Sequence, residues 1–97
     1  MNATQLKKQT TKEIINLLIE DFDAYNINRE AQYIEFFADI DGFEIDMQMD
    51  TRDYSVSSWD SVTLAGDGWK MEDMNKQIAA AILEERINQA IEKKLGR

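Results

Sequence analysis

The most regular pattern in the chain is an alternation of apolar and polar residues on both sides of Asp41-Gly42. Every second residue is apolar across residues 34–40, and the alternation resumes across residues 43–49. Such alternation is typical of half-buried strands, and Asp-Gly between two such runs favours a two-residue type I′ turn. This turn pairs Ile40 with Phe43 and places an apolar residue opposite every other apolar residue. We therefore predict an antiparallel hairpin in this register, because a one-residue slip would destroy the match.

Helical periodicity replaces this alternation before the hairpin. Ile14, Leu18 and Phe22 recur every four residues, which predicts a helix from about Thr11 to Ala24. Residues 1–9 either fray or extend this helix.

Polar residues suggest where this helix begins and ends. Thr10 followed three residues later by Glu13 predicts a capping box at its start. Asn26 and Asn28 favour turn conformations, so we expect them to follow its end.

A second, longer helix is predicted at the end of the chain, from Met71 to Leu95, with Gly96 as its terminator. Its apolar residues form two stripes roughly 150° apart around the helix. The first stripe contains Met71, Met74, Ile78 and Ile82, and the second contains Leu83, Ile87, Ala90 and Ile91. A straight helix cannot press both stripes on one sheet. Either the helix breaks near residues 84–86, or the second stripe contacts the N-terminal segment or a second copy of the protein.

Residues 51–70 give the least regular signal. A third strand is predicted around Tyr54 and Val56 or around Val62 and Leu64. The fold class that follows is α+β, over a single domain of residues 1–97. An N-terminal helix precedes the hairpin, which extends to a three- or four-stranded meander, and the long C-terminal helix packs on one sheet face (α-β-β-β-α).

The net charge of the protein is −8, but it is unevenly distributed. Residues 1–12 carry +3, residues 13–73 carry −13 and residues 74–97 carry +2. Contact with nucleic-acid phosphates requires clustered Lys and Arg, so the acidic middle argues against direct nucleic-acid binding. A basic protein surface is the electrostatically complementary partner.

The sequence also bears on the cellular location. No stretch approaches the roughly 20 apolar residues of a membrane span, and residues 1–12 lack the apolar centre of a signal peptide. The chain contains no Cys, so a disulfide framework is excluded. We therefore expect a cytoplasmic protein with no membrane partner.

Residue types needed for common catalysis are missing. The chain has no His and no Cys, which removes the commonest general base, thiol nucleophiles and ordinary zinc sites. The acids from Asp39 to Asp46 lack the spacing of an EF-hand calcium loop. The Gly66-Asp67-Gly68 segment carries no phosphate-binding fingerprint, and we attribute it to a turn beside a core residue, Trp69. We predict a protein that is not an enzyme and needs no cofactor or metal.

The outward face of the predicted hairpin carries more carboxylate than folding requires. It contains Tyr33, Glu35, Phe37, Asp39, Asp41, Glu44 and Asp46. The register places Asp39 directly opposite Glu44, and like charges across a ladder destabilise it. At ~5 Å this repulsion is about 1 kcal/mol even in water. One interpretation is a solvated face whose charges are screened, and the other is a recognition surface with the two aromatic residues as anchors.

Two hypotheses for function follow. The first is a small acidic regulatory protein whose hairpin face engages a basic protein surface. It would compete there with nucleic acid, by analogy with small inhibitory proteins of phages and mobile elements. The alternative is a structural component that forms homodimers or larger assemblies through Leu83, Ile87, Ala90 and Ile91 of the C-terminal helix. The bland interpretation of this stripe is contact with the first helix of the same chain.

Overall fold

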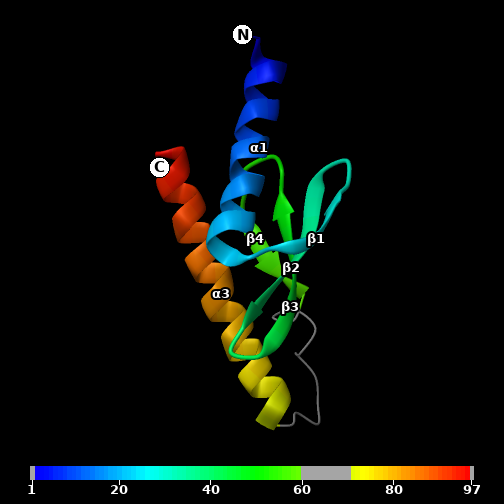
Figure 1. Ribbon diagram of the computed structural model, residues 1–97, viewed down its shortest axis with the longest axis vertical. Coiled ribbons are helices and arrows are strands. Elements are labelled where there is room, and N and C mark those ends of the chain that lie inside the picture. Colours follow the sequence, from blue (N-terminus) through cyan, green and yellow to red (C-terminus); the bar gives the residue numbers. More distant parts are fainter. Residues whose placement is uncertain (1, 60–70, 97) are drawn as a thin grey trace.

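A computed structural model describes residues 2–59 and 71–96 of the protein, and it shows two helices on one face of a four-stranded antiparallel sheet (Figure 1). The strands follow one another as a meander in the order β1-β2-β3-β4. The elements are α1 (Ala3–Phe22), β1 (Tyr25–Arg29), β2 (Tyr33–Ile40), β3 (Phe43–Asp50), β4 (Val56–Ser58) and α3 (Met71–Leu95). This layout confirms the predicted α+β class with its helix-meander-helix order. No helix in the described ranges combines the length and apolar character that a bilayer crossing demands.

The first helix begins well before the predicted start. Asn2 is the N-cap, and its side chain accepts a hydrogen bond from the Gln5 backbone N–H at 2.9 Å. The Gln5 side chain accepts one from the Asn2 N–H at 3.2 Å, which completes a capping box. The capping box predicted at Thr10 is therefore wrong, and residues 3–9 extend the helix. The first turns of α1 reach beyond the sheet (Figure 1), where Leu6 is exposed.

The hairpin has the predicted register at every pair. Ile40 lies opposite Phe43 at the turn, and Tyr33 lies opposite Asp50 at the far end. Asp41 and Gly42 both adopt positive φ, at 52° and 82°, as a type I′ turn requires. The apolar set from the two strands lies on the helix side of the sheet, where all its members are buried except Ile40 and Phe43 at the turn, which are partly buried.

The fourth strand is short and has a protected edge. Val56 pairs with Met49 of β3, as one of the two predicted third strands required, whereas Tyr54 precedes the strand with a positive φ of 64°. The side chain of Asn88 on α3 donates to the Val56 carbonyl at 2.9 Å and accepts from its N–H at 2.8 Å. The edge groups of this residue are thus satisfied within the protein instead of being left open to another chain. The alternative strand at Val62 and Leu64, and the predicted turn and core Trp at 66–69, lie outside the described residues.

The core lies between the sheet and the two helices. Its fully buried members come from β2, β3 and both helices, and they include Ile14, Leu18, Phe36, Ile45, Met47, Met49, Ile87 and Ile91. The hydrophobic effect contributes about 1.5–3 kcal/mol for each such side chain that is withdrawn from water. Because the inward-facing side chains of the hairpin pack in this core, the outward-facing side chains remain available to solvent or partners.

Helix α3 is continuous, and its two apolar stripes differ in burial. It runs without a break through residues 84–86 and stops before Gly96, whose φ is 75°. The second stripe faces the core, and within the first stripe Met74, Ile78 and Ile82 are exposed.

Candidate functional site

The outward side of the sheet carries the acidic residues of the hairpin. The paired strands point one set of side chains at the helices and the alternate set away from them, so Phe36 is buried while its neighbour Phe37 is half-buried. We call the outward surface near the hairpin turn the acidic face. It consists of Tyr25, Phe37, Asp39, Glu44 and Asp46.

A tyrosine that sequence reasoning did not single out organises this face. The hydroxyl of Tyr25 lies 2.8 Å from Asp39 Oδ1 and 2.6 Å from Glu44 Oε2, and it donates to these carboxylates. Asp39 and Glu44 are directly opposite each other in the ladder, as predicted. A hydroxyl has a single hydrogen, so it cannot fully satisfy both acceptors at once. Two carboxylates thus converge on one shared donor and retain capacity to accept further hydrogen bonds from a cationic group.

The two carboxylates also change the acidity of this tyrosine. They raise the pKa of the Tyr25 phenol above its ordinary value, chiefly through the hydrogen bond to Glu44 and then through desolvation and the bond to Asp39. The physical cause is that ionised Tyr25 would place a third negative oxygen between two others. The phenol therefore remains a hydrogen-bond donor throughout the neutral pH range.

An irregularity in β1 places Tyr25 on this face. Tyr25 lies opposite Phe37 and Asn28 opposite Glu35, so three steps along β1 match two steps along β2. The extra residue is accommodated at Asn26, which has a positive φ of 51°. With regular alternation, Tyr25 and Arg29 would share one side of the sheet. The bulge instead sends them to opposite sides.

Aromatic stacking and a second pair of residues complete the acidic face. The rings of Tyr25 and Phe37 stack with their centroids 5.9 Å apart. Asp46 lies opposite Phe37 in the ladder and is half-buried. Asp41 is exposed in the turn, next to this group along the chain. The structure therefore brings most of the predicted acids together at the turn end of the hairpin.

The remaining predicted residues lie at the other end of the hairpin. Tyr33 is six residues from Asp39 along β2, a separation of about 20 Å for an extended strand. At that end Arg52 already binds Asp50, with an Nη2 to Oδ2 distance of 2.6 Å. The hydrogen bond from this guanidinium, followed by the one from the Arg52 backbone N–H, lowers the pKa of Asp50 to about 2. Tyr33 and Glu35 thus belong to a surface that is partly neutralised, away from the Tyr25 cluster.

The predicted oligomer stripe on α3 has a different place. Leu83, Ile87 and Ile91 are buried against the chain's own core, and Ala90 is half-buried beside them. Contact between copies through these side chains would require the core to open. The bland interpretation, an internal contact that includes α1, is the one that the structure shows, because the core cluster joins this stripe to Ile14 and Leu18.

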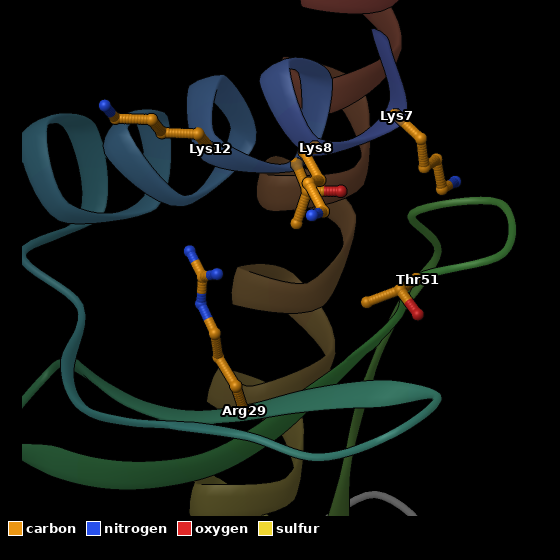
Figure 2. A pocket seen from close by; sticks show the side chains of 6 residues that line it. Lys7, Lys8, Lys12, Arg29 and Thr51 are labelled. Atoms are coloured by element: carbon orange, nitrogen blue, oxygen red, sulfur yellow. The ribbon is translucent and has the colours of Figure 1, made fainter. Parts of the chain in front are cut away.

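A second charged region lies on the helix side of the sheet, between α1 and β1. A cleft of about 540 Å³ is lined there by Lys7, Lys8, Thr11, Lys12, Arg29 and Thr51 (Figure 2), and we call it the basic cleft. Arg29 rises from β1 toward α1, and Lys8 points from α1 into the same space (Figure 2). Four cations and no carboxylate line it, although the whole protein carries −8.

Tyr54 contacts two residues that line the basic cleft, Thr11 and Lys7. Tyr54 is buried, and its hydroxyl hydrogen-bonds with the Thr11 hydroxyl at 2.9 Å. Lys7 Nζ lies 4.1 Å from the centroid of the same ring, a cation-π distance. The left-handed backbone of Tyr54 and its N–H bond to the Asp50 carbonyl, at 2.7 Å, hold the loop in place. Helix α1 is thereby anchored to the loop after β3.

Two further observations bear on chemistry and identity. Among the Asp and Glu side chains that the structure describes, no group of three is suited to holding a metal ion. Comparisons with protein-family models, curated proteins and solved structures found no match to this chain.

Sequence reasoning missed both Tyr25 and the basic cleft for the same reason. Each depends on β1, which was not predicted because Asn26 and Asn28 were interpreted as turn residues. The weak signal was the alternation of Tyr25, Ile27 and Arg29, combined with the +3 charge of residues 1–12.

Proposed function

We propose that this is a small acidic binding protein whose acidic face engages a basic segment of another protein. The observation that carries the proposal is the convergence of Asp39 and Glu44 on the single hydroxyl of Tyr25. Folding alone would favour keeping like charges apart across a ladder. Here they are held together beside an aromatic stack, a combination that suits the capture of Lys or Arg side chains.

The restrained carboxylates of this face support a role in binding a partner over a role in general charge repulsion. The carboxylates are on paired central strands, and Tyr25 restrains their side chains before a partner arrives. Pre-organised groups lose less conformational entropy on binding, so more of the interaction energy appears as affinity. Arg is the better-matched ligand because its planar fork can donate to two carboxylate oxygens at once.

Competition with nucleic acid is the form of regulation that we propose for this binding. A protein surface that binds phosphate backbones presents clustered Lys and Arg. The acidic face would occupy such a cluster with carboxylates in place of phosphates. Catalysis is not part of the proposal, because the acidic face combines carboxylates with no His or Cys.

The test uses a defined probe, an unstructured peptide rich in Arg and Lys, titrated into the protein by calorimetry at low and moderate salt. The variant carries Asp39→Asn, Glu44→Gln and Asp46→Asn. Three ion pairs of about 0.5 kcal/mol each amount to roughly tenfold in affinity, so we expect a loss of about that size. A short DNA duplex that binds the same peptide should be displaced by the wild-type protein and not by the variant.

A matched control separates recognition from net charge. Glu20→Gln, Asp21→Asn and Glu92→Gln remove the same three charges from exposed positions on the helices. We expect this control to keep most of the affinity. Equal weakening of both variants would show that the peptide responds only to total charge, and the proposal would then fail.

A further inference from the structure

The basic cleft is unusual because it is lined by four cations and by no carboxylate. Among the described residues, no ion pair involves Lys8, Lys12 or Arg29. Lys8 and Lys12 are four residues apart on α1, so they share one side of the helix and repel each other. In a protein of net charge −8, partners for these cations would be easy to supply. Their absence from the cleft needs an explanation.

The walls of the cleft are built from elements that the fold holds in place. The bulge at Asn26 turns Arg29 to the helix side of the sheet, where it points toward α1 (Figure 2). The opposite wall is α1, which Tyr54 ties to the loop after β3 through Thr11. Thr51 is positioned by its backbone N–H, which donates to the Gln32 carbonyl at 3.1 Å. Arg29 and the lysines of α1 therefore line one cleft because of the architecture of the fold.

We propose that the basic cleft binds a small molecule that carries two or more phosphate groups. Its volume of about 540 Å³ lies within the usual range for small-ligand pockets. The Arg29 guanidinium supplies a planar fork for phosphate oxygens, and the lysines supply mobile point charges around it. Thr51 adds a hydroxyl at the rim. This proposal does not depend on the acidic face and concerns the other side of the sheet.

The geometry favours a small ligand over nucleic acid. The cations are confined to one cleft and number four, whereas proteins that bind duplex DNA through its backbone make about 6–10 phosphate contacts along an extended surface. A long polyanion that left the cleft along β1 would meet the acidic face on the other side of this strand. A compact ligand avoids that repulsion.

The test is calorimetric titration of the full chain with inorganic tripolyphosphate, with orthophosphate as the single-phosphate comparison. We expect one tripolyphosphate to bind per protein. The affinity for orthophosphate should be lower by roughly tenfold or more, since each added phosphate group brings further charge-assisted contacts. The variant Lys8→Gln, Lys12→Gln, Arg29→Gln should lose about tenfold or more in affinity. Its control, Arg86→Gln, Lys93→Gln, Lys94→Gln, removes two lysines and one arginine from α3 and should bind like the wild type. Thermal unfolding of both variants shows whether they remain folded.

Several outcomes would overturn the proposal. These are no binding of tripolyphosphate, equal loss in the two triple variants, or affinity for single-stranded oligonucleotides that exceeds that for tripolyphosphate and rises with their length. The last result would assign the cleft to nucleic acid. Binding to vesicles that contain a phosphoinositide, without binding to tripolyphosphate, would assign it to a membrane surface. If the triple variant fails to fold, Arg29→Gln alone is measured, and unchanged tripolyphosphate affinity in this variant counts against the proposal.

Discussion

The acidic face and the basic cleft lie on opposite sides of the same short strand, β1, but they are held in different ways. On the acidic face the charged atoms themselves are positioned, because Tyr25 is hydrogen-bonded to both Asp39 and Glu44. In the cleft the walls are positioned, while Lys8 and Lys12 remain exposed. The first arrangement selects a partner by geometry, and the second selects mainly by charge. This difference is the reason why we propose a protein partner for the acidic face and a small, highly charged ligand for the basic cleft.

The largest effect on this two-sided arrangement should come from a substitution in the core that supports both sides. Phe36 is fully buried, whereas Phe37 is half-buried on the acidic face. Phe36→Ala should lower the free energy of unfolding by about 3–5 kcal/mol through lost burial and an internal cavity. Phe37→Ala should cost about 1–2 kcal/mol, largely the stacking with Tyr25. Chemical denaturation measures both, and similar losses would contradict the assignment of the two faces.

The bulge in β1 is the next point at which the arrangement can be broken. Asn26 has a φ of 51°, where a β-branched residue is strained. Asn26→Ile should destabilise the protein by about 1–2 kcal/mol, and Asn26→Gly should be nearly neutral. If the bulge straightens in the Ile variant, Tyr25 also leaves the carboxylates and its phenol pKa falls. Equal stability of the Ile and Gly variants would argue against the positive φ.

The pKa of Tyr25 reports on the hydrogen bonds of the acidic face, and substitutions there should change it while the fold is kept. The folded-state pKa is raised, so its contribution to stability is present below the pKa of an unfolded tyrosine, about 10, and is lost as pH rises through the folded value. Glu44→Gln should lower the Tyr25 pKa more than Asp39→Asn, because Glu44 has the larger effect. Ultraviolet titration of tyrosinate measures this shift, with Tyr25→Phe to assign the transition. An unperturbed phenol in the wild type would contradict the hydrogen-bonded cluster.

The smallest expected effect concerns the far end of the hairpin. The pKa of Asp50 is lowered from 3.8 to about 2, first by its side-chain bond with Arg52. The stabilisation that results is present above the unfolded pKa and is lost as pH falls through about 2. Carbon-detected NMR titration should show Arg52→Gln raising the Asp50 pKa part of the way to 3.8, because the Arg52 backbone N–H still donates at 2.8 Å. Lys7→Gln should raise it less. An unchanged Asp50 pKa in Arg52→Gln would contradict the ion pair between these two residues.

Local patterns in the sequence predicted the central part of the fold. The hairpin register follows from alternation and Asp41-Gly42, both readable within a few residues, and every predicted pair is present. The limits of α3 follow from its periodicity and from Gly96. The predicted opposition of Asp39 and Glu44 on the outward face is a direct consequence of the correct register.

Features that depend on distant contacts could not be predicted in this way. Strand β1 exists because β2 offers a pairing edge, so its two asparagines are in a strand despite their preference for turns. Tyr25 reaches carboxylates 14 and 19 residues away. Which stripe of α3 faces inward depends on tertiary packing, since both stripes are equally periodic. The start of α1 at Ala3 competes with an equally plausible cap at Thr10, and the local pattern does not decide between them.

The measurement that tests the two-sided account most directly is NMR mapping on one isotope-labelled sample. The Arg- and Lys-rich peptide is added first, and tripolyphosphate is added to a second portion. The account predicts shifts around Tyr25, Asp39 and Glu44 with the peptide, and shifts around Lys8 and Arg29 with tripolyphosphate, with little overlap. Shifts spread over the same residues for both ligands, or over neither region, would contradict it.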